Sequence, residues 1–297
     1  MDKRKFRDFI GIKLMIIVSS IITILFLMIF FTLISKSAYI LSNFSITDLL
    51  FSSIWNPERG EFGLFPIIVS TILVTGLSLL IAVPLSLFSA VYISEYSNRK
   101  TRTILRPFID VLAGVPSVVY GLCAFLFLVP LVKDSIAPFF GVESTGLCIF
   151  SASIILAVMV FPIIISVCIE SFRSIPVGLK EASLSIGATK WETVQKIIFR
   201  ASGPNIISAV LLGFGRAFGE TIAVNMVVGG IPKMPESLFH PGQTLASLIA
   251  SAYGEMMSVP LYESALMFVA LVLFIVVFLF NLLGVIILRR AKRKWKY

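Results

Sequence analysis

Six long apolar runs constrain this chain more than any other feature of its sequence. The hydrocarbon core of a bilayer is about 30 Å thick, and a helix needs about 20 residues to cross it. Each run reaches that length, and the segments between the runs are short or polar. With 58% hydrophobic and 14% charged residues, the chain is predicted to be an all-α, polytopic membrane protein with six transmembrane helices. The runs cover residues 12–34, 65–93, 107–132, 147–169, 205–230 and 263–288.

The distribution of basic residues indicates how these helices are oriented. Most of the 25 Lys and Arg residues lie in segments that would share one side of the membrane. Cytoplasmic loops carry an excess of Lys and Arg, so both termini are predicted to be cytoplasmic. This topology also explains the net charge of +9. Membrane lipid is therefore the expected surrounding, and nucleic acid is not an expected partner.

The sequence contains no catalytic or metal-binding pattern. Cys123, Cys148 and Cys168 lie singly inside apolar runs, without the spacing of a metal or redox pair, and we interpret them as packing residues. The only histidine, His240, has no cysteine or carboxylate neighbour and is interpreted as a loop residue. The chain also has no G-x-x-x-x-G-K-[ST] phosphate loop. We therefore do not expect it to be an enzyme or to hold a cofactor or metal.

Charged residues occur within two of the apolar runs. In "GRAFGE", residues 215–220, Arg216 would lie roughly 15 Å or more from either end of its run, so it should face a bundle interior or a wet pathway. Glu220 is four residues further on and therefore on the same helix face. Two interpretations stay open: an ion pair that only fastens the fifth helix, or a substrate pathway in which Arg216 binds an anion. Asp110, near the start of the third run, and Arg106, which directly precedes that run, are interpreted as an ion pair at the membrane edge.

Glycine and proline residues mark sites of helix packing or bending. Gly215 and Gly219 form a G-x-x-x-G pattern, which lets another helix approach closely. Pro116, which follows Gly114, is predicted to bend or interrupt the third helix, because proline removes a helix hydrogen bond.

The longest cytoplasmic connection, residues 171–204, has a helical pattern although it does not cross the membrane. A first short helix would present a face of small and apolar residues, and Gly187 would end it. The stretch "TKWE", residues 189–192, matches a capping box that starts a second helix. Two such helices would form a knob suited to a groove on a soluble partner, or an amphipathic pair lying on lipid. The face consists of Leu179, Ala182, Ser183 and Ile186.

Part of this connection, "EASLSIGATKWETVQKIIFR" (181–200), resembles the EAA signature of binding-protein-dependent ABC importer permeases. It departs from the signature at Ser183, at Phe199 and at Arg200, which takes the usual proline position. In that family the segment, here about residues 174–200, docks into a cleft of the ATP-hydrolysing subunit. The resemblance implies that ATP and Mg²⁺ are bound by a separate, dimeric ATPase subunit. The residues that match in register are Glu181, Ala182, Gly187 and Ile197.

Four further stretches are similar to the C-type permease family of phosphate importers, usually called PstC. They are "WNPERGEFGLFP" (55–66), "AGVPSVVYG" (113–121), "GRAFGETIAVNMVVGG" (215–230) and "TLASLIA" (244–250). The resemblance implies a type I ABC importer permease of the cytoplasmic membrane that translocates inorganic phosphate. It also implies three partners: an A-type permease, the ATP-binding subunit and an extracytoplasmic phosphate-binding protein.

The predicted organisation has three parts. Residues 1–63 contain the first helix and an extracytoplasmic loop, residues 64–288 the ABC type-1 transmembrane domain, and residues 289–297 a basic cytoplasmic tail. The alternatives are an A-type phosphate permease, a permease for another oxyanion, and an ion-coupled secondary transporter. In the last of these, Arg216 and Glu220 would be the coupling site and the cytoplasmic knob would have no use.

Overall fold

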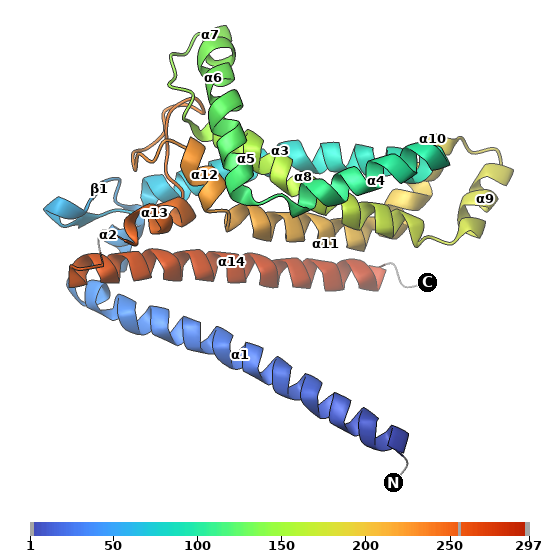
Figure 1. Cartoon of the computed structure of the whole chain (residues 1–297), viewed down its shortest axis with the longest axis horizontal. Coiled ribbons are helices and arrows are strands. Elements are labelled where there is room, and N and C mark those ends of the chain that lie inside the picture. Colours follow the sequence, from blue (N-terminus) through green and yellow to red (C-terminus); the bar gives the residue numbers. More distant parts are fainter. Residues whose placement is uncertain (1–2, 255–256, 295–297) are drawn as a thin grey trace.

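The computed structural model describes residues 3–254 and 257–294 and confirms an all-α membrane architecture (Figure 1). Within these residues, six helical stretches are long and apolar enough to cross a bilayer, as predicted. Four of them lie close to the predicted ranges, and the third and fifth are displaced along the chain. The six stretches are Phe9–Asn43, Phe65–Tyr96, Ser117–Phe139, Ile149–Arg173, Lys190–Phe218 and Pro260–Arg290.

The N-terminal part of the chain consists of a long helix and a small hairpin. Trp55 pairs with Phe62 across the antiparallel hairpin, and their rings meet edge to face with centroids 5.7 Å apart. The elements are α1 (Lys3–Asn43), α2 (Ile46–Phe51), β1 (Trp55–Asn56), the 3₁₀ turn η1 (Pro57–Arg59) and β2 (Glu61–Phe62).

The central part is built on two long, apolar helices, α3 (Phe65–Val91) and α8 (Ile149–Arg173), which pack along each other. Small residues on α3 allow close approach, and the Ser86 hydroxyl donates to the Phe161 carbonyl of α8 (3.3 Å). The elements between them are the π-helix η2 (Tyr92–Tyr96), α4 (Arg99–Gly114), α5 (Ser117–Cys123), the π-helix η3 (Ala124–Leu128), α6 (Val129–Leu131), the π-helix η4 (Val132–Ile136) and α7 (Ala137–Phe139).

In the C-terminal part, α11 packs against both α8 and α3, and the last helix, α14, packs against α1 and α11. In Figure 1, α1 diverges from α14 toward its N-terminal end, and its apolar side chains are largely exposed. The elements are α9 (Val177–Ser185), α10 (Lys190–Thr193), the π-helix η5 (Val194–Ile198), α11 (Phe199–Phe218), α12 (Ile222–Val227), α13 (Leu245–Ala252) and α14 (Pro260–Lys294).

The predicted third and fifth spans are each interrupted, which explains their displacement. Helix α4 ends at Gly114, and Val115 and Pro116 are extended before α5 begins, because proline disfavours the helical conformation in the residue before it. Helix α11 ends at Phe218, and α12 begins only at Ile222. Apolar sequence continues across both interruptions, so hydropathy alone did not reveal them. In Figure 1, the segment α5–α7 rises steeply across the direction of α3, α8 and α11.

Candidate functional site

The two helix interruptions lie next to each other, because α5 and α12 start directly after them and pack together (Figure 1). Gly121 makes this packing possible. A Cβ atom on Gly121 would lie 3.0 Å from the Ala223 Cα atom and 2.7 Å from the Met226 sulfur. The fold therefore places two non-helical segments next to each other within a largely apolar helix bundle. They are residues 115–116 and residues 219–221.

Arg216 and Glu220 lie on opposite sides of the second interruption. Arg216 is in the last turn of α11 and is exposed, whereas Glu220 follows the end of that helix. The Ala223 amide of α12 donates to the Glu220 carboxylate (3.4 Å). The expected pairing of Arg216 with Glu220 is not among the ion pairs of the described residues. Once the helix stops at Phe218, a spacing of four residues no longer corresponds to one helical turn.

The helix that carries Arg216 also differs from the expected one. The fifth span extends from Lys190 to Phe218 rather than from residue 205 to 230, so Arg216 lies two residues before the C-terminal end of its helix. A cation in the last turn interacts favourably with the partial negative charge of the helix carbonyl end. The structure thus compensates this arginine by a helix terminus, and among the residues that the structure describes no carboxylate forms an ion pair with its guanidinium.

Tyr120 lies beside the first of these two interruptions, and no role was predicted for it from the sequence. Its hydroxyl donates to the Leu112 carbonyl (2.8 Å) and so connects α5 back to the last turn of α4 across the Pro116 interruption. A hydroxyl-bearing ring four residues after Pro116 in an apolar run was the available signal.

The predicted packing glycines behave differently from the expectation. A Cβ atom on Gly215 would meet nothing within 4 Å, and one on Gly219 would meet only the Gly215 carbonyl at 3.5 Å. Both glycines line an apolar cavity of about 450 Å³ between α1, α11 and α14. Close approach occurs instead at Gly213, where a Cβ atom would lie 2.8 Å from Ile164. Gly114 likewise has no neighbour within 4 Å of a Cβ position.

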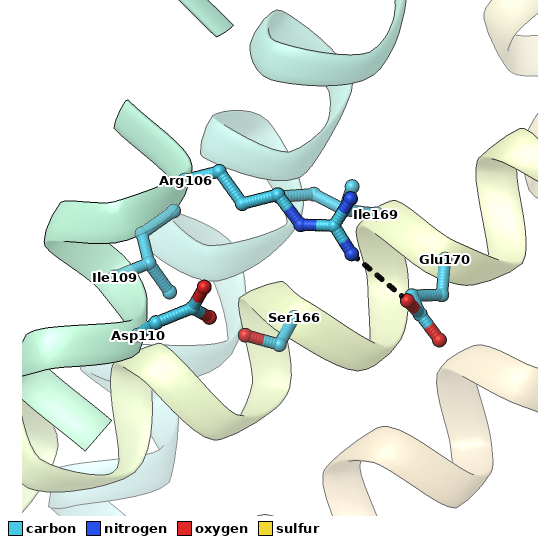
Figure 2. A pocket seen from close by; sticks show the side chains of 6 residues that line it. All are labelled: Arg106, Ile109, Asp110, Ser166, Ile169 and Glu170. Carbon is cyan, nitrogen blue, oxygen red and sulfur yellow. Dashed lines mark hydrogen bonds and ion pairs between the residues drawn. The ribbon is translucent and has the colours of Figure 1, made fainter. Parts of the chain in front are cut away.

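A second group of charges lies between α4 and α8, but with a different pairing from the predicted one. Arg106 donates to the Glu170 carboxylate of α8 (3.1 Å) rather than pairing with Asp110 (Figure 2). Asp110 and Ser166 line the same cavity of about 130 Å³. The Arg106 and Glu170 side chains are both well exposed, so this pair adds little to stability.

The coupling segment, residues 174–200, is partly as predicted. Gly187 has a φ of 88° directly after the end of α9, and Thr189 and Glu192 form the capping box. The second helix is not a separate short one, because α10 continues through η5 into α11. Ser183 faces inward, with its hydroxyl 3.0 Å from that of Thr193, while Glu181 and Ala182 are exposed.

Adjacent helix interruptions within a six-span bundle, an exposed cation beside them and an exposed helix at one end of the bundle are together typical of a membrane transport component. Residues 82–297 match the family described as binding-protein-dependent transport system inner membrane component. The chain belongs to this family and is a multi-pass protein of the cell membrane. Membership excludes the ion-coupled secondary transporter considered above.

Relatives and solved structures agree with this assignment. The chain is 36% identical over 261 residues to the phosphate transport system permease protein PstC of Xylella fastidiosa, covering 83% of this chain and 80% of that protein. It is 34% identical over 258 residues to the probable PstC of Methanocaldococcus jannaschii, covering 82% of each. A solved bacterial ABC transporter involved in alginate import has a TM-score of 0.62 at 17% identity, over 99% of this chain and 100% of that chain. The fold is that of a type I ABC importer permease.

Proposed function

We propose that this chain is the permease subunit of an ABC importer that carries inorganic phosphate across the cytoplasmic membrane. Relatives that cover about four fifths of the chain are named as phosphate permeases. The observation that carries the assignment within this chain is Arg216, an exposed guanidinium without a carboxylate partner among the described residues, at the meeting of two helix interruptions.

Arg216 supplies what a passing phosphate requires. Its planar guanidinium offers parallel N–H donors that match two phosphate oxygens, and charge-assisted bonds of this kind are roughly twice as strong as neutral ones. Glu220, four residues away, repels the same anion and limits how tightly it is held. This balance suits a conduit, because a transport pathway must release what it binds.

The energy source is a separate subunit in this proposal. The coupling segment presents Leu179 and Ile186 with exposed fractions of 50% and 84%, and these apolar side chains suit a groove on a soluble partner. Glu181, Ala182 and Gly187 would dock the segment into the dimeric ATPase, which would bind ATP and Mg²⁺. A second, A-type permease and an extracytoplasmic phosphate-binding protein would complete the importer.

The test is radiolabelled phosphate uptake by liposomes that contain all four components. Arg216→Lys and Arg216→Gln should lower uptake about 10- to 100-fold, which corresponds to the loss of a hydrogen bond to a charged group. Assembly with the partners should persist. Arg289→Lys is the control, because Arg289 is an exposed arginine of α14 outside both the coupling segment and the candidate pathway, and it should transport normally.

Normal uptake by Arg216→Gln would reject the pathway role of this residue. Competition distinguishes the substrate: excess unlabelled phosphate should suppress uptake, and excess sulfate should not. Suppression by sulfate instead would identify a permease for another oxyanion.

A further inference from the structure

An enclosed ion pair joins the coupling segment to the end of α3. The Lys180 ammonium of α9 donates to the Glu95 carboxylate of η2 (2.7 Å), and the two side chains are only 19% and 12% exposed. Lys180 also donates to the Phe172 carbonyl in the last turn of α8 (3.2 Å). The second pair of the segment, Lys196 with Glu192, is 66% and 41% exposed. Lys180 therefore holds α9 to the ends of both central helices.

The end of α3 that receives Lys180 is itself tied to other elements. Residues 92–96 form a π-helical turn, a form that is rare and often found at functional sites. Arg102 of α4 donates to the Ile93 and Ser94 carbonyls of this turn (3.1 and 2.6 Å). The Lys190 ammonium lies over the Tyr96 ring, 4.9 Å from its centroid. Helices α4, α9 and α10 thus all contact one short turn.

This turn is connected to the candidate pathway by α4. Arg102 lies in the first turn of α4, and the same helix ends at the Pro116 interruption, where the Tyr120 hydroxyl bonds to its last turn. A displacement of α9 would be passed through Lys180 and Glu95 to the end of α3, and through Arg102 to α4. The far end of α4 lies beside the helix interruptions.

We infer that Lys180 and Glu95 are positioning residues that convert displacement of the coupling segment into movement of the helix interruptions at the pathway. The inference rests on the proposed function, because it requires an ATPase docked on this segment. An enclosed ion pair suits the role: removing one member leaves the other charge uncompensated in a poorly solvated place. Such a loss loosens the contact even where the docking face itself is intact.

The experiment measures phosphate transported per ATP hydrolysed by the complete complex in liposomes. Glu95→Gln and Lys180→Gln should lower this ratio at least about threefold, within the range by which residues distant from both sites modulate coupling, while ATP hydrolysis continues. The exchange of both charges, Glu95→Lys with Lys180→Glu, should restore much of the ratio. Lys36→Gln removes a more exposed ion pair outside the coupling segment, Lys36 with Glu263, and should leave the ratio unchanged.

An unchanged ratio in Glu95→Gln and Lys180→Gln would overturn the inference. If either single variant fails to assemble, the double exchange decides: assembly with a restored ratio supports the pair, and assembly with a ratio that stays at least about threefold below that of the unaltered complex rejects it. Failure of the proposed function would be visible earlier, as absence of ATP-dependent phosphate uptake by the unaltered complex.

Discussion

Arg216 and Glu220 show how the position of a helix end changes the meaning of two charges. On a continuous helix they would neutralise each other, and they would need no further function. With α11 ending at Phe218, the arginine is compensated by the carbonyl end of its helix, an effect worth about 0.3–1 kcal/mol when exposed. The glutamate accepts from a backbone amide of α12. Each charge is therefore stabilised by backbone groups, as the proposed binding of an anion by Arg216 requires.

Single glycines give a direct test of which helix contacts exist in this chain. In Gly213→Ala, the added methyl group would lie within 2.9 Å of Ile164 and Val160 side-chain atoms, and overpacking of this kind costs about 1–3 kcal/mol. Gly215→Ala adds the same methyl group, to the same helix, where nothing lies within 4 Å. The midpoint of thermal unfolding of the purified complex should fall for Gly213→Ala and stay or rise for Gly215→Ala. The reverse order would restore the G-x-x-x-G interpretation.

Individual roles were predictable where the signal was local in the sequence. Gly187 and the capping box at Thr189 depend on neighbouring residues, and both were found as predicted. The partners of Lys180 and Arg106 lie 85 and 64 residues away in the chain. No helical spacing could reveal these partners, and the local alternative, Asp110 with Arg106, was wrong for this reason.

At the scale of elements, the interruptions decide what the helices can do. Hydropathy sums over about 20 residues, so it found six spans but misplaced the third and the fifth. Of the two interruptions, only the one at Pro116 was predicted, from the proline itself. A break in a helix leaves backbone carbonyl and amide groups without their usual helical partners. Within an apolar bundle, these groups must form other hydrogen bonds. The Tyr120 hydroxyl takes one such carbonyl. Discontinuous helices of this type are where transporters place their substrate sites.

The end of α9 offers a test at this scale. Gly187→Ala places a methyl group on a residue with a φ of 88°, a conformation that costs an L-residue roughly 1–2 kcal/mol. Gly178→Ala, within α9 and with open space around its Cβ position, should be neutral or slightly stabilising. Hydrogen exchange of residues 177–186 should therefore become faster in Gly187→Ala only. Equal exchange in both variants would show that Gly187 does not fix the end of α9.

At the scale of the whole molecule, the elements are arranged along one direction. In Figure 1, the start of α1, the end of α14 and the helix α9 lie toward one end of the molecule, and the hairpin that includes β1 lies toward the other. The basic residues concentrate near the first end. Large apolar surfaces of α1 and α14 remain exposed, as expected for helices that contact lipid, and part of this surface would be covered by the second permease of the proposed importer.

The orientation of this arrangement in the membrane is a prediction from the positive-inside rule, and ATP gives it a second reason. A docked ATPase must reach cytoplasmic ATP, so α9 and both termini should face the cytoplasm. Cys123→Ala, Cys148→Ala and Cys168→Ala give a background without cysteine, in which Glu58→Cys of η1 or Lys100→Cys of α4 is introduced singly. A membrane-impermeant maleimide should label Glu58→Cys in intact cells and Lys100→Cys, outside the docking segment, only after permeabilisation. Both positions are exposed, so reversed labelling would mean an inverted chain and would separate the coupling segment from its energy source.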